Sequence, residues 1–311
     1  MEFGLRHLSD EDLTDYVEES RRFNAARAAA AGDRPRPDPT TPEGLQQARD
    51  RTASVDPLGR PVVERLAEAG GRQVPVRVIA PEQGQIRGVY LDIPGGAFYL
   101  SQAARSDARN ASLADALGVA VVTVDYRLAP EDPWPAATDD CETAAAWLVE
   151  QAGALFGTAR LAIGGGSAGA NLAMTSLFRL RDRGLAEHFA GVLLQFGTYD
   201  LSGRSPGGRL YADEFFIKFY AGSVADRTNP DISPLYGDLS GLPPALIIVG
   251  ALDSLLEDNL AMAARLSAAG GEVDVRVYPE STHGFTSHPT AMAAAATRGI
   301  ESWLAGRLIR K

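Results

Sequence analysis

The sequence predicts an α/β fold with a mostly parallel central sheet flanked by helices. Three observations support this prediction. From about residue 61 onward, short apolar runs alternate with helical stretches, as in chains built from repeated strand–helix units. Several of the runs are continuous in Val, Ile and Leu, which is typical of strands buried on both faces. One run, which ends at residue 164, leads through glycines and a serine into a helical stretch.

Composition narrows the class of protein. The chain has 311 residues, of which 45% are hydrophobic and 23% charged, so we expect a packed globular core. The net charge of −10 and the lack of a basic run argue against binding to nucleic acid. Cys141 is the only cysteine, so no intrachain disulfide can form. The first residues do not resemble a secretory signal, and no apolar run approaches the roughly 20 residues of a membrane helix. We therefore expect a soluble cytoplasmic protein that does not bind a membrane.

The first 55 residues predict a small helical segment. Ser9 and Asp12 resemble a capping box at a helix start. A helical stripe then runs through Leu13, Tyr16, Val17 and Phe23. Gly32 can end this helix, and the prolines at 35, 37, 39 and 42 predict a linker, because proline breaks both helix and sheet. We expect residues 1–55 to form an N-terminal cap segment and residues 56–311 to form the main domain.

The strands and helices of the main domain follow in alternation. The expected strands are residues 74–80, 87–93, 119–126, 160–164, 191–196, 245–250 and 273–279. The expected helices are residues 106–117, 140–154, 168–183 and 255–269.

One long connection interrupts this pattern. About 45 residues separate the strands at 191–196 and 245–250, and a connection of that length inside a compact domain is usually functional or has its own structure. We expect a second cap or lid segment at about residues 201–230, acting together with the N-terminal segment. The alternative is a peripheral helix packed on the sheet.

Ser167 is the candidate nucleophile. The segment 165–169 matches G-x-S-x-G and lies between a predicted strand and a predicted helix, which is the setting of a nucleophile elbow. Small flanking residues let the hydroxyl of Ser167 project from the strained turn, and the N-terminus of the following helix favours an anion there. The alternative is that Ser167 is merely a small residue in a tight turn.

A serine nucleophile needs a base, and His283 is the best placed of the four histidines. It follows the last predicted strand, where a loop would lie at the carboxyl edge of the sheet. The alternative for His283 is a structural surface histidine. His288 has a less constrained setting, and we expect His7 and His188 to be solvated on helices.

Asp253 is the candidate acid that orients this histidine, because it directly follows the strand at 245–250. Its alternative role is an N-cap for a helix that starts at Ser254. Glu257 and Asp258 come a turn later, and their position predicts ordinary solvated helix surface.

Backbone N–H groups complete the predicted site. The N–H of Ala168, which follows the serine, can donate to the oxygen that becomes negative during acyl transfer. The glycine-rich segment 93–98 is placed to supply further donors, although it is equally consistent with a simple turn at the end of a strand.

These segments together resemble the hormone-sensitive-lipase-like family of α/β-hydrolases, bacterial carboxylesterases with an H-G-G-G motif. GGSAGANLA is similar to the family's elbow G-D-S-A-G-G-N-L-A, and DYRLAPEDPWPAA at 125–137 is similar to its Y-R-L-A-P-E-H-P-F-P-A-A segment. LPPALIIVGALDSLLED and VYPESTHGF resemble its acid and histidine segments. The resemblance runs from about residue 75 to the end of the chain, whereas the N-terminal helices match only in kind.

The resemblance implies an α/β-hydrolase fold with a helical cap. It places the nucleophile, acid and base on Ser167, Asp253 and His283, and it implies no metal or other cofactor. The oxyanion donors that it implies are the N–H groups of Gly96, Ala97 and Ala168. By the same resemblance, Arg127 and Glu131 brace the site without taking part in the chemistry.

The chain departs from the family at two places. Where the family has H-G-G-G-F, this chain has Pro94 to Phe98, so an imidazole and an N–H are lost and the third glycine becomes Ala97. A positive φ at Ala97 would be strained. Gly166 replaces the usual acidic residue before the serine, which removes a charge near the elbow.

We therefore predict a serine hydrolase that cleaves a small-molecule carboxylic ester with a small acyl group, acetyl in the first instance. One alternative is a tailoring enzyme that removes acetate from one complex natural product by hydrolysis or elimination. A further alternative is a non-catalytic binding protein on the same scaffold. The resemblance also allows a homodimer that pairs through the edge of the strand at 273–279. The residues expected to line the acyl pocket, if they are not simply core, are Phe98, Tyr99, Phe215, Phe216 and Phe219.

Overall fold

The computed structural model describes residues 4–5, 14–31, 37–53, 58–100 and 103–309. Its strands form one sheet in the order β1-β9-β8-β7-β6-β4-β5-β3-β2. β3 pairs antiparallel with both β2 and β5, and every other pairing is parallel, so the predicted mostly parallel sheet is confirmed. The strands are β1 (Gly4–Leu5), β2 (Val63–Ala69), β3 (Arg72–Ile79), β4 (Val89–Ile93), β5 (Ala120–Val124), β6 (Leu161–Gly166), β7 (Phe189–Gln195), β8 (Ala245–Gly250) and β9 (Val273–Tyr278).

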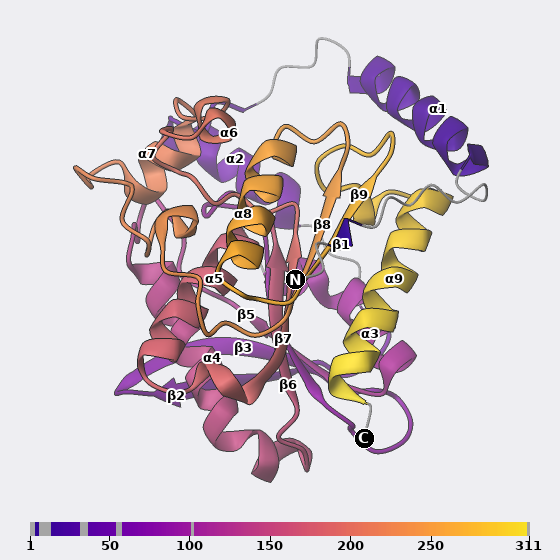
Figure 1. Cartoon of the computed structure of the whole chain (residues 1–311), viewed down its shortest axis with the longest axis vertical. Helices are drawn as coiled ribbons and strands as arrows, with labels where there is room; N and C mark the ends of the chain where they lie inside the picture. Colours follow the sequence, from indigo (N-terminus) through magenta and orange to yellow (C-terminus); the bar gives the residue numbers. More distant parts are fainter. Residues whose placement is uncertain (1–3, 6–13, 32–36, 54–57, 101–102, 310–311) are drawn as a thin grey trace.

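Helices cover both faces of the sheet. Figure 1 shows α3 and α9 on one face and α4, α5 and α8 on the other. The four helices expected in the main domain are present, although α4 begins four residues earlier than predicted. The helices are α1 (Thr14–Ala31), α2 (Pro42–Ala53), α3 (Asp107–Leu117), α4 (Ala136–Phe156), α5 (Ala168–Asp182), α6 (Pro206–Arg209), α7 (Phe215–Ala221), α8 (Leu256–Ala268) and α9 (Ala291–Leu308). The 3₁₀ turns are η2 (Ala103–Ser106), η3 (Ala186–His188), η4 (Pro234–Tyr236) and η5 (Phe285–Ser287).

The apolar runs form two cores, one on each face of the sheet. Along β4, Val89, Leu91 and Ile93 join the core beneath α4 and α5, whereas Tyr90 joins the core beneath α3 and α9. Successive side chains of a strand point to opposite faces, so a strand buried on both faces must be apolar at nearly every position. All five β4 residues are buried.

β2 was not predicted from the sequence. It forms a hairpin with β3 through the two-residue turn Gly70–Gly71, in which φ is +57° and +75°. Two glycines at positive φ are typical of the tightest hairpin turns, and this pair was the available signal. The rest of β2 gives no strand pattern in the sequence, because Val63, Glu64 and Leu66 are exposed and apolar and polar residues do not alternate over its first half.

The order of the strands positions the site. The chain passes from β4 to β5 on one side and then returns to β6 on the other side of β4. The loops after β4 and β6 therefore begin side by side, where Ile93 pairs with Gly165. Such a reversal at the carboxyl ends of parallel strands is the usual place for a ligand site.

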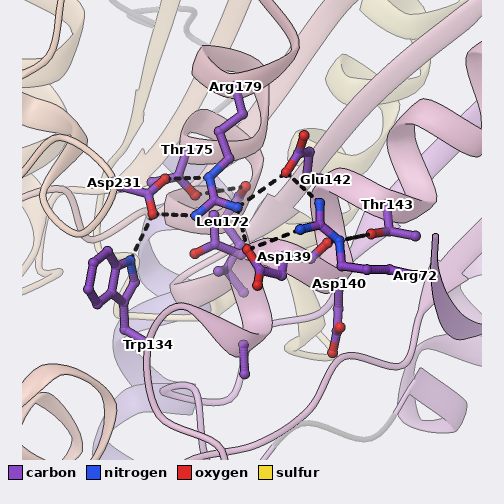
Figure 2. A network of polar contacts seen from close by, with 12 residues as sticks. Arg72, Trp134, Asp139, Asp140, Glu142, Thr143, Leu172, Thr175, Arg179 and Asp231 are labelled. Carbon is purple, nitrogen blue, oxygen red and sulfur yellow. Dashed lines mark hydrogen bonds and ion pairs between the residues drawn. The ribbon is translucent and has the colours of Figure 1, made fainter. Parts of the chain in front are cut away.

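The long connection between β7 and β8 contains α6, α7 and η4 and is tied to the main domain by Arg179 of α5 (Figure 2). This guanidinium contacts Asp231 of the connection through two hydrogen bonds of 2.7 and 2.6 Å, and it also bonds Asp139 of α4 at 2.6 Å. The indole of Trp134 donates a third bond to Asp231, at 2.8 Å. Burial lowers the pKa of Arg179, but its bonds with Asp231 and Asp139 outweigh burial and raise that pKa overall.

The two N-terminal helices lie at different places. α1 packs against α9 and against the segment just before it, in which His288 lies. Phe23 contacts the imidazole of His288 at a ring separation of 4.8 Å, and Arg27 bonds the same imidazole at 2.7 Å. α2 lies instead against the loop after β4, as described below. Whether residues 1–55 and 201–230 act together as a cap stays a prediction. The predicted capping box, Leu13, His7, Gly32 and Pro35 lie outside the described residues.

The edge of β9 carries β1, whose Gly4 and Leu5 pair with Asp274 and Val275. That pairing occupies part of the edge through which a homodimer was predicted, and the dimer itself stays a prediction. In the described part of the chain, no helix has the length and apolar character needed to cross a membrane.

Candidate active site

Ser167 occupies a sharp turn between β6 and α5. Its φ and ψ are +55° and −121°, a conformation that non-glycine residues rarely adopt and that concentrates at functional sites. The neighbouring chain leaves no room for side chains, because a Cβ on Gly165 or Gly169 would overlap the carbonyl oxygen of Ile93. The backbone N–H of Ser167 donates to the carbonyl of Gln195 at 2.9 Å, which fixes the turn against β7. The predicted strand–turn–helix setting is therefore present.

The three predicted polar residues meet at this turn. The Nε2 atom of His283 lies 3.1 Å from Oγ of Ser167, and Nδ1 lies 3.0 Å from Oδ2 of Asp253. Because a carboxylate can only accept, Nδ1 carries the proton and Nε2 is left as an acceptor facing the serine hydroxyl. Asp253 follows β8 and His283 follows β9, so adjacent parallel strands bring together residues that are far apart in sequence.

Asp253 and His283 differ in how deeply they are buried. The side chain of Asp253 is fully buried, whereas that of His283 is 42% exposed. Oδ1 of Asp253 also accepts the N–H of Leu255 at 2.9 Å. The alternative of a helix cap at Asp253 was wrong, because α8 begins at Leu256 after Leu255 and no side-chain hydrogen bond caps it. The bond from Leu255 instead closes a local turn in the loop before the helix. The ring of Phe196 contacts His283 edge-on at 5.1 Å and limits its rotation.

The loop after β4 contains three consecutive residues at positive φ. Gly96, Ala97 and Phe98 have φ values of +136°, +50° and +64°. Ala97 is therefore strained, as expected for alanine at a positive φ. Among the described residues, the N–H groups of Gly96, Ala97 and Ala168 donate to no protein acceptor. Three such donors beside a serine hydroxyl can bind an oxygen that carries negative charge.

Close packing holds this loop against the serine turn. A Cβ on Gly95 would come within 2.6 Å of the carbonyl oxygen of Gly166 and 3.4 Å of Cβ of Ser167. Pro94, which stands where the family has histidine, offers its carbonyl to the hydroxyl of Tyr126 at 2.9 Å. This bond provides one anchor for the loop in the absence of an imidazole.

Arg49 of α2 provides a second anchor. Its guanidinium donates to the carbonyls of Tyr99 and Ala129, each at 3.0 Å, and pairs with Glu131 at 2.7 Å. This contact was not foreseen from the sequence, because Arg49 lies about eighty residues from Glu131. Arg127 bonds Asp140 of α4 at 2.8 Å, so it braces the main domain at a separate place.

A cavity of about 270 Å³ opens at the serine. Of the five predicted pocket residues, Phe98 and Phe216 line it. Tyr99, Phe215 and Phe219 do not, and they form an aromatic cluster with ring separations of 5.3 to 5.8 Å. The remaining lining residues are Ala97, Ser167, Ala168, Thr198, Tyr211, Glu214, Ser254, Leu255 and His283, of which Thr198, Tyr211, Glu214, Ser254 and Leu255 were missed.

The prediction that Asp258 lies on a solvated surface was wrong. This side chain is buried, and Oδ2 accepts the hydroxyl of Tyr211 at 2.5 Å and the N–H groups of Tyr199 and Asp200. The long connection supplies all three donors, and it covers α8 at the position of Asp258. Burial raises the pKa of Asp258 to about 6, although the three hydrogen bonds oppose that rise. Glu257 is exposed, as expected.

The other histidines also have defined places. His188 is exposed, as predicted, and it lies in a 3₁₀ turn. His288 packs against α1, and burial together with the nearby Arg27 lowers its pKa. No group of three or more metal-binding side chains gathers anywhere in the part of the chain that the structure describes.

Comparison with known proteins adds to this geometry. A family model described as alpha/beta hydrolase fold matches residues 90–287. Carboxylic ester hydrolase LipN from Mycobacterium tuberculosis is 32% identical over 76% of this chain and 68% of its own length. Ethyl acetate hydrolase from Pseudomonas putida is 35% identical over 71% of this chain and 74% of its own. A crystal structure of a hormone-sensitive lipase from a metagenome library superposes with a TM-score of 0.79, at 29% identity, over 93% of this chain and 98% of that one.

Proposed function

This chain belongs to the hormone-sensitive-lipase-like carboxylesterases of the α/β-hydrolase fold, and from that membership we propose that Ser167, His283 and Asp253 cleave esters as a catalytic triad. The activity of a carboxylesterase follows from the family, whereas the roles of these residues are our proposal. The observation that carries it is the continuous chain of contacts from Oγ through the imidazole to the buried carboxylate, with steps of 3.1 and 3.0 Å.

The proposed reaction begins when Nε2 of His283 accepts the serine proton as Oγ of Ser167 attacks the ester carbonyl. The carbonyl oxygen becomes negative and accepts hydrogen bonds from the N–H groups of the two loops, at Gly96, Ala97 and Ala168. His283 then gives its proton to the departing alcohol, which leaves an acyl group on Oγ. A water molecule, deprotonated by the same imidazole, attacks that acyl group and releases the acid and free serine.

Asp253 assists without exchanging a proton with the substrate. Its carboxylate keeps the proton of the imidazole on Nδ1, and its negative charge stabilises the imidazolium that forms after the first proton transfer. Full burial strengthens this effect, because few water molecules screen the charge.

We propose a small acyl group, acetyl in the first instance. The cavity at Ser167 holds only about 270 Å³ and is lined by Phe98 and Phe216, and Ala97 adds a methyl group to its wall where the family has glycine. The relative from Pseudomonas putida is named for the hydrolysis of ethyl acetate, which supports the same choice. No described contact favours elimination over hydrolysis in the tailoring alternative.

Replacement of the serine tests this function. We expect Ser167→Ala to lower kcat for 4-nitrophenyl acetate by roughly 10⁴-fold or more, since the remaining triad members act only through the nucleophile. Ser112→Ala, at an exposed serine on α3, is the matched control and should retain full activity. A fluorophosphonate should label the wild type and the control but not Ser167→Ala. Hydrolysis that survives in Ser167→Ala, or labelling of another residue, would refute the triad.

A further inference from the structure

The active-site cavity contains one carboxylate that the proposed hydrolysis does not use. Glu214 lines the same cavity of about 270 Å³ as Ser167 and His283. Apart from the imidazole, the other lining side chains are uncharged, and no lysine or arginine is among them. The connection between β7 and β8 supplies Glu214, so it also supplies the only fixed negative charge on the described cavity wall.

The charge of Glu214 is not neutralised by a neighbour. Among the residues that the structure describes, no hydrogen bond and no ion pair reaches its carboxylate, and the side chain does not cap α7. Its backbone N–H donates to the carbonyl of Tyr211 at 3.0 Å, which fixes the position of the residue without using its side chain. Lys218 lies one turn further along α7 and is exposed, and no ion pair joins it to Glu214.

Aromatic rings line the cavity together with this carboxylate. Tyr211 and Phe216 stack at a ring separation of 6.4 Å and an angle of 24°. Phe98 also lines the cavity, and its buried ring stacks on Tyr220. Aromatic faces attract cations, and they attract alkylammonium groups in particular because those groups are only weakly hydrated. A carboxylate beside aromatic rings is therefore suited to an ammonium group and is unfavourable for an anionic substrate.

We infer that this cavity selects acetate esters of alcohols that carry a positively charged ammonium group, with Glu214 as the residue that determines this preference. The inference rests on the proposed function, because an acetyl group has no position for a charge and the cation must lie on the alcohol part. The oxygen of that alcohol is bonded to the carbonyl carbon attacked by Ser167, so an ammonium two carbons away remains inside the same small cavity.

A purely structural role for Glu214 makes a different prediction. A carboxylate at the N-terminus of α7 would stabilise the helix through its dipole. Removing that charge would lower the melting temperature and would affect charged and neutral substrates alike. A role in selection instead changes the ratio of two substrates, so the ratio separates the two explanations.

The test compares acetylcholine, the acetate ester of choline, with 3,3-dimethylbutyl acetate, in which a carbon replaces the charged nitrogen and the shape is retained. The attraction between a positive charge and a carboxylate about 5 Å apart in a water-like dielectric raises the binding affinity about fourfold, and it raises the affinity more where water is partly excluded. We expect Glu214→Gln to lower the ratio of kcat/KM for the charged over the neutral ester by about fourfold to tenfold. The preference of the wild type should also weaken as salt is added, because salt screens the attraction.

Asp213→Asn is the matched control. Asp213 is the preceding residue, is exposed and does not line the cavity, so its replacement changes the net charge equally without touching the site. We expect its ratio to match that of the wild type. Glu214→Lys should reverse the preference.

Three results would overturn the inference. The first is an unchanged ratio in Glu214→Gln, and the second is an equal change in Glu214→Gln and Asp213→Asn. The third is a wild type that cleaves 4-nitrophenyl acetate but neither of the paired esters, which would leave the proposed function intact. A wild type that cleaves no ester at all would refute both the inference and the proposed function.

Discussion

Replacement of the buried Asp258 by asparagine should change how the stability of the fold depends on pH. The carboxyl of Asp258 has a pKa of about 6 in the folded protein, because burial disfavours its charged form, against an ordinary value of 3.8. Between these two pH values the folded protein retains a proton that the unfolded chain has lost. The folded state therefore binds more protons, and its stability falls as the pH rises.

The size of this effect follows from the two pKa values. Each unit of difference is worth about 1.4 kcal/mol, so ionisation of Asp258 costs the folded protein about 3 kcal/mol between pH 3.8 and roughly pH 7. This contribution is fully present below pH 3.8 and is lost as the pH passes through about 6. Asparagine keeps an oxygen that can accept hydrogen bonds and never ionises, so Asp258→Asn lacks this dependence.

Urea unfolding followed by tryptophan fluorescence provides the assay. We expect the free energy of unfolding of the wild type, relative to Asp258→Asn, to fall by about 3 kcal/mol from about pH 4 to about pH 7. Glu257→Gln is the matched control, because Glu257 is the preceding residue and is exposed. Wild-type and Asp258→Asn curves that stay parallel over this range would show that Asp258 does not titrate as its burial requires.

Three further replacements test how the site is held. Gly95→Ala places a Cβ 2.6 Å from the carbonyl oxygen of Gly166, so we expect it to shift the loop. We expect kcat/KM for 4-nitrophenyl acetate to fall at least tenfold and the free energy of unfolding in urea to fall by about 2 kcal/mol. Gly153→Ala is the control, because a Cβ there meets open space and should change none of these properties. Arg49→Ala removes the donor to two loop carbonyls, and we expect a stability loss of about 1 to 3 kcal/mol together with lower kcat; unchanged kinetics would show that α2 does not support the loop. Arg179→Met leaves Asp231 without its cation and leaves Asp139 and Glu142 with Arg72 as their shared partner, so we expect a loss of about 3 to 5 kcal/mol by thermal unfolding. A loss below about 1 kcal/mol would contradict the anchoring role.

Much of the fold follows from the sequence because strands buried on both faces must be apolar throughout. The run at 245–250 has no polar residue, and it forms β8 over the same six residues. The positions of the proposed triad residues were predictable for a related reason. Ligand sites of parallel sheets lie at the carboxyl ends of the strands, and Asp253 comes shortly after β8 and His283 shortly after β9.

The remaining features depend on contacts between distant parts of the chain. Asp258 has the local pattern of a surface acid, and it is buried because Tyr199 and Tyr211 cover it from a connection some fifty residues earlier. The position of α1 also depends on a distant contact, because Arg27 of α1 bonds His288, which lies 261 residues later in the chain. Neither contact leaves a periodic signal in the sequence, because both depend on how the connections pass over the finished sheet.

Which side chains line the cavity could also be predicted only in part from the sequence. Phe215, Phe216 and Phe219 share one short helix, and only Phe216 lines the cavity. Aromatic composition predicted that this helix lies near the site, but the rotation of the helix decided which ring lines the cavity. Glu214 was missed because an acid just before a helix is ordinarily explained as part of the helix start.

The most direct test of the triad is to trap the acyl group during turnover. We predict that 4-nitrophenyl acetate, quenched in acid within the first turnovers, leaves one acetyl group per chain, and that peptide mass spectrometry locates it on Ser167. His283→Ala should strongly slow formation of this adduct, because Oγ then lacks the base that lies 3.1 Å away. An acetyl group on any other residue, or rapid hydrolysis with Ser167 unmodified throughout, would contradict the proposed mechanism.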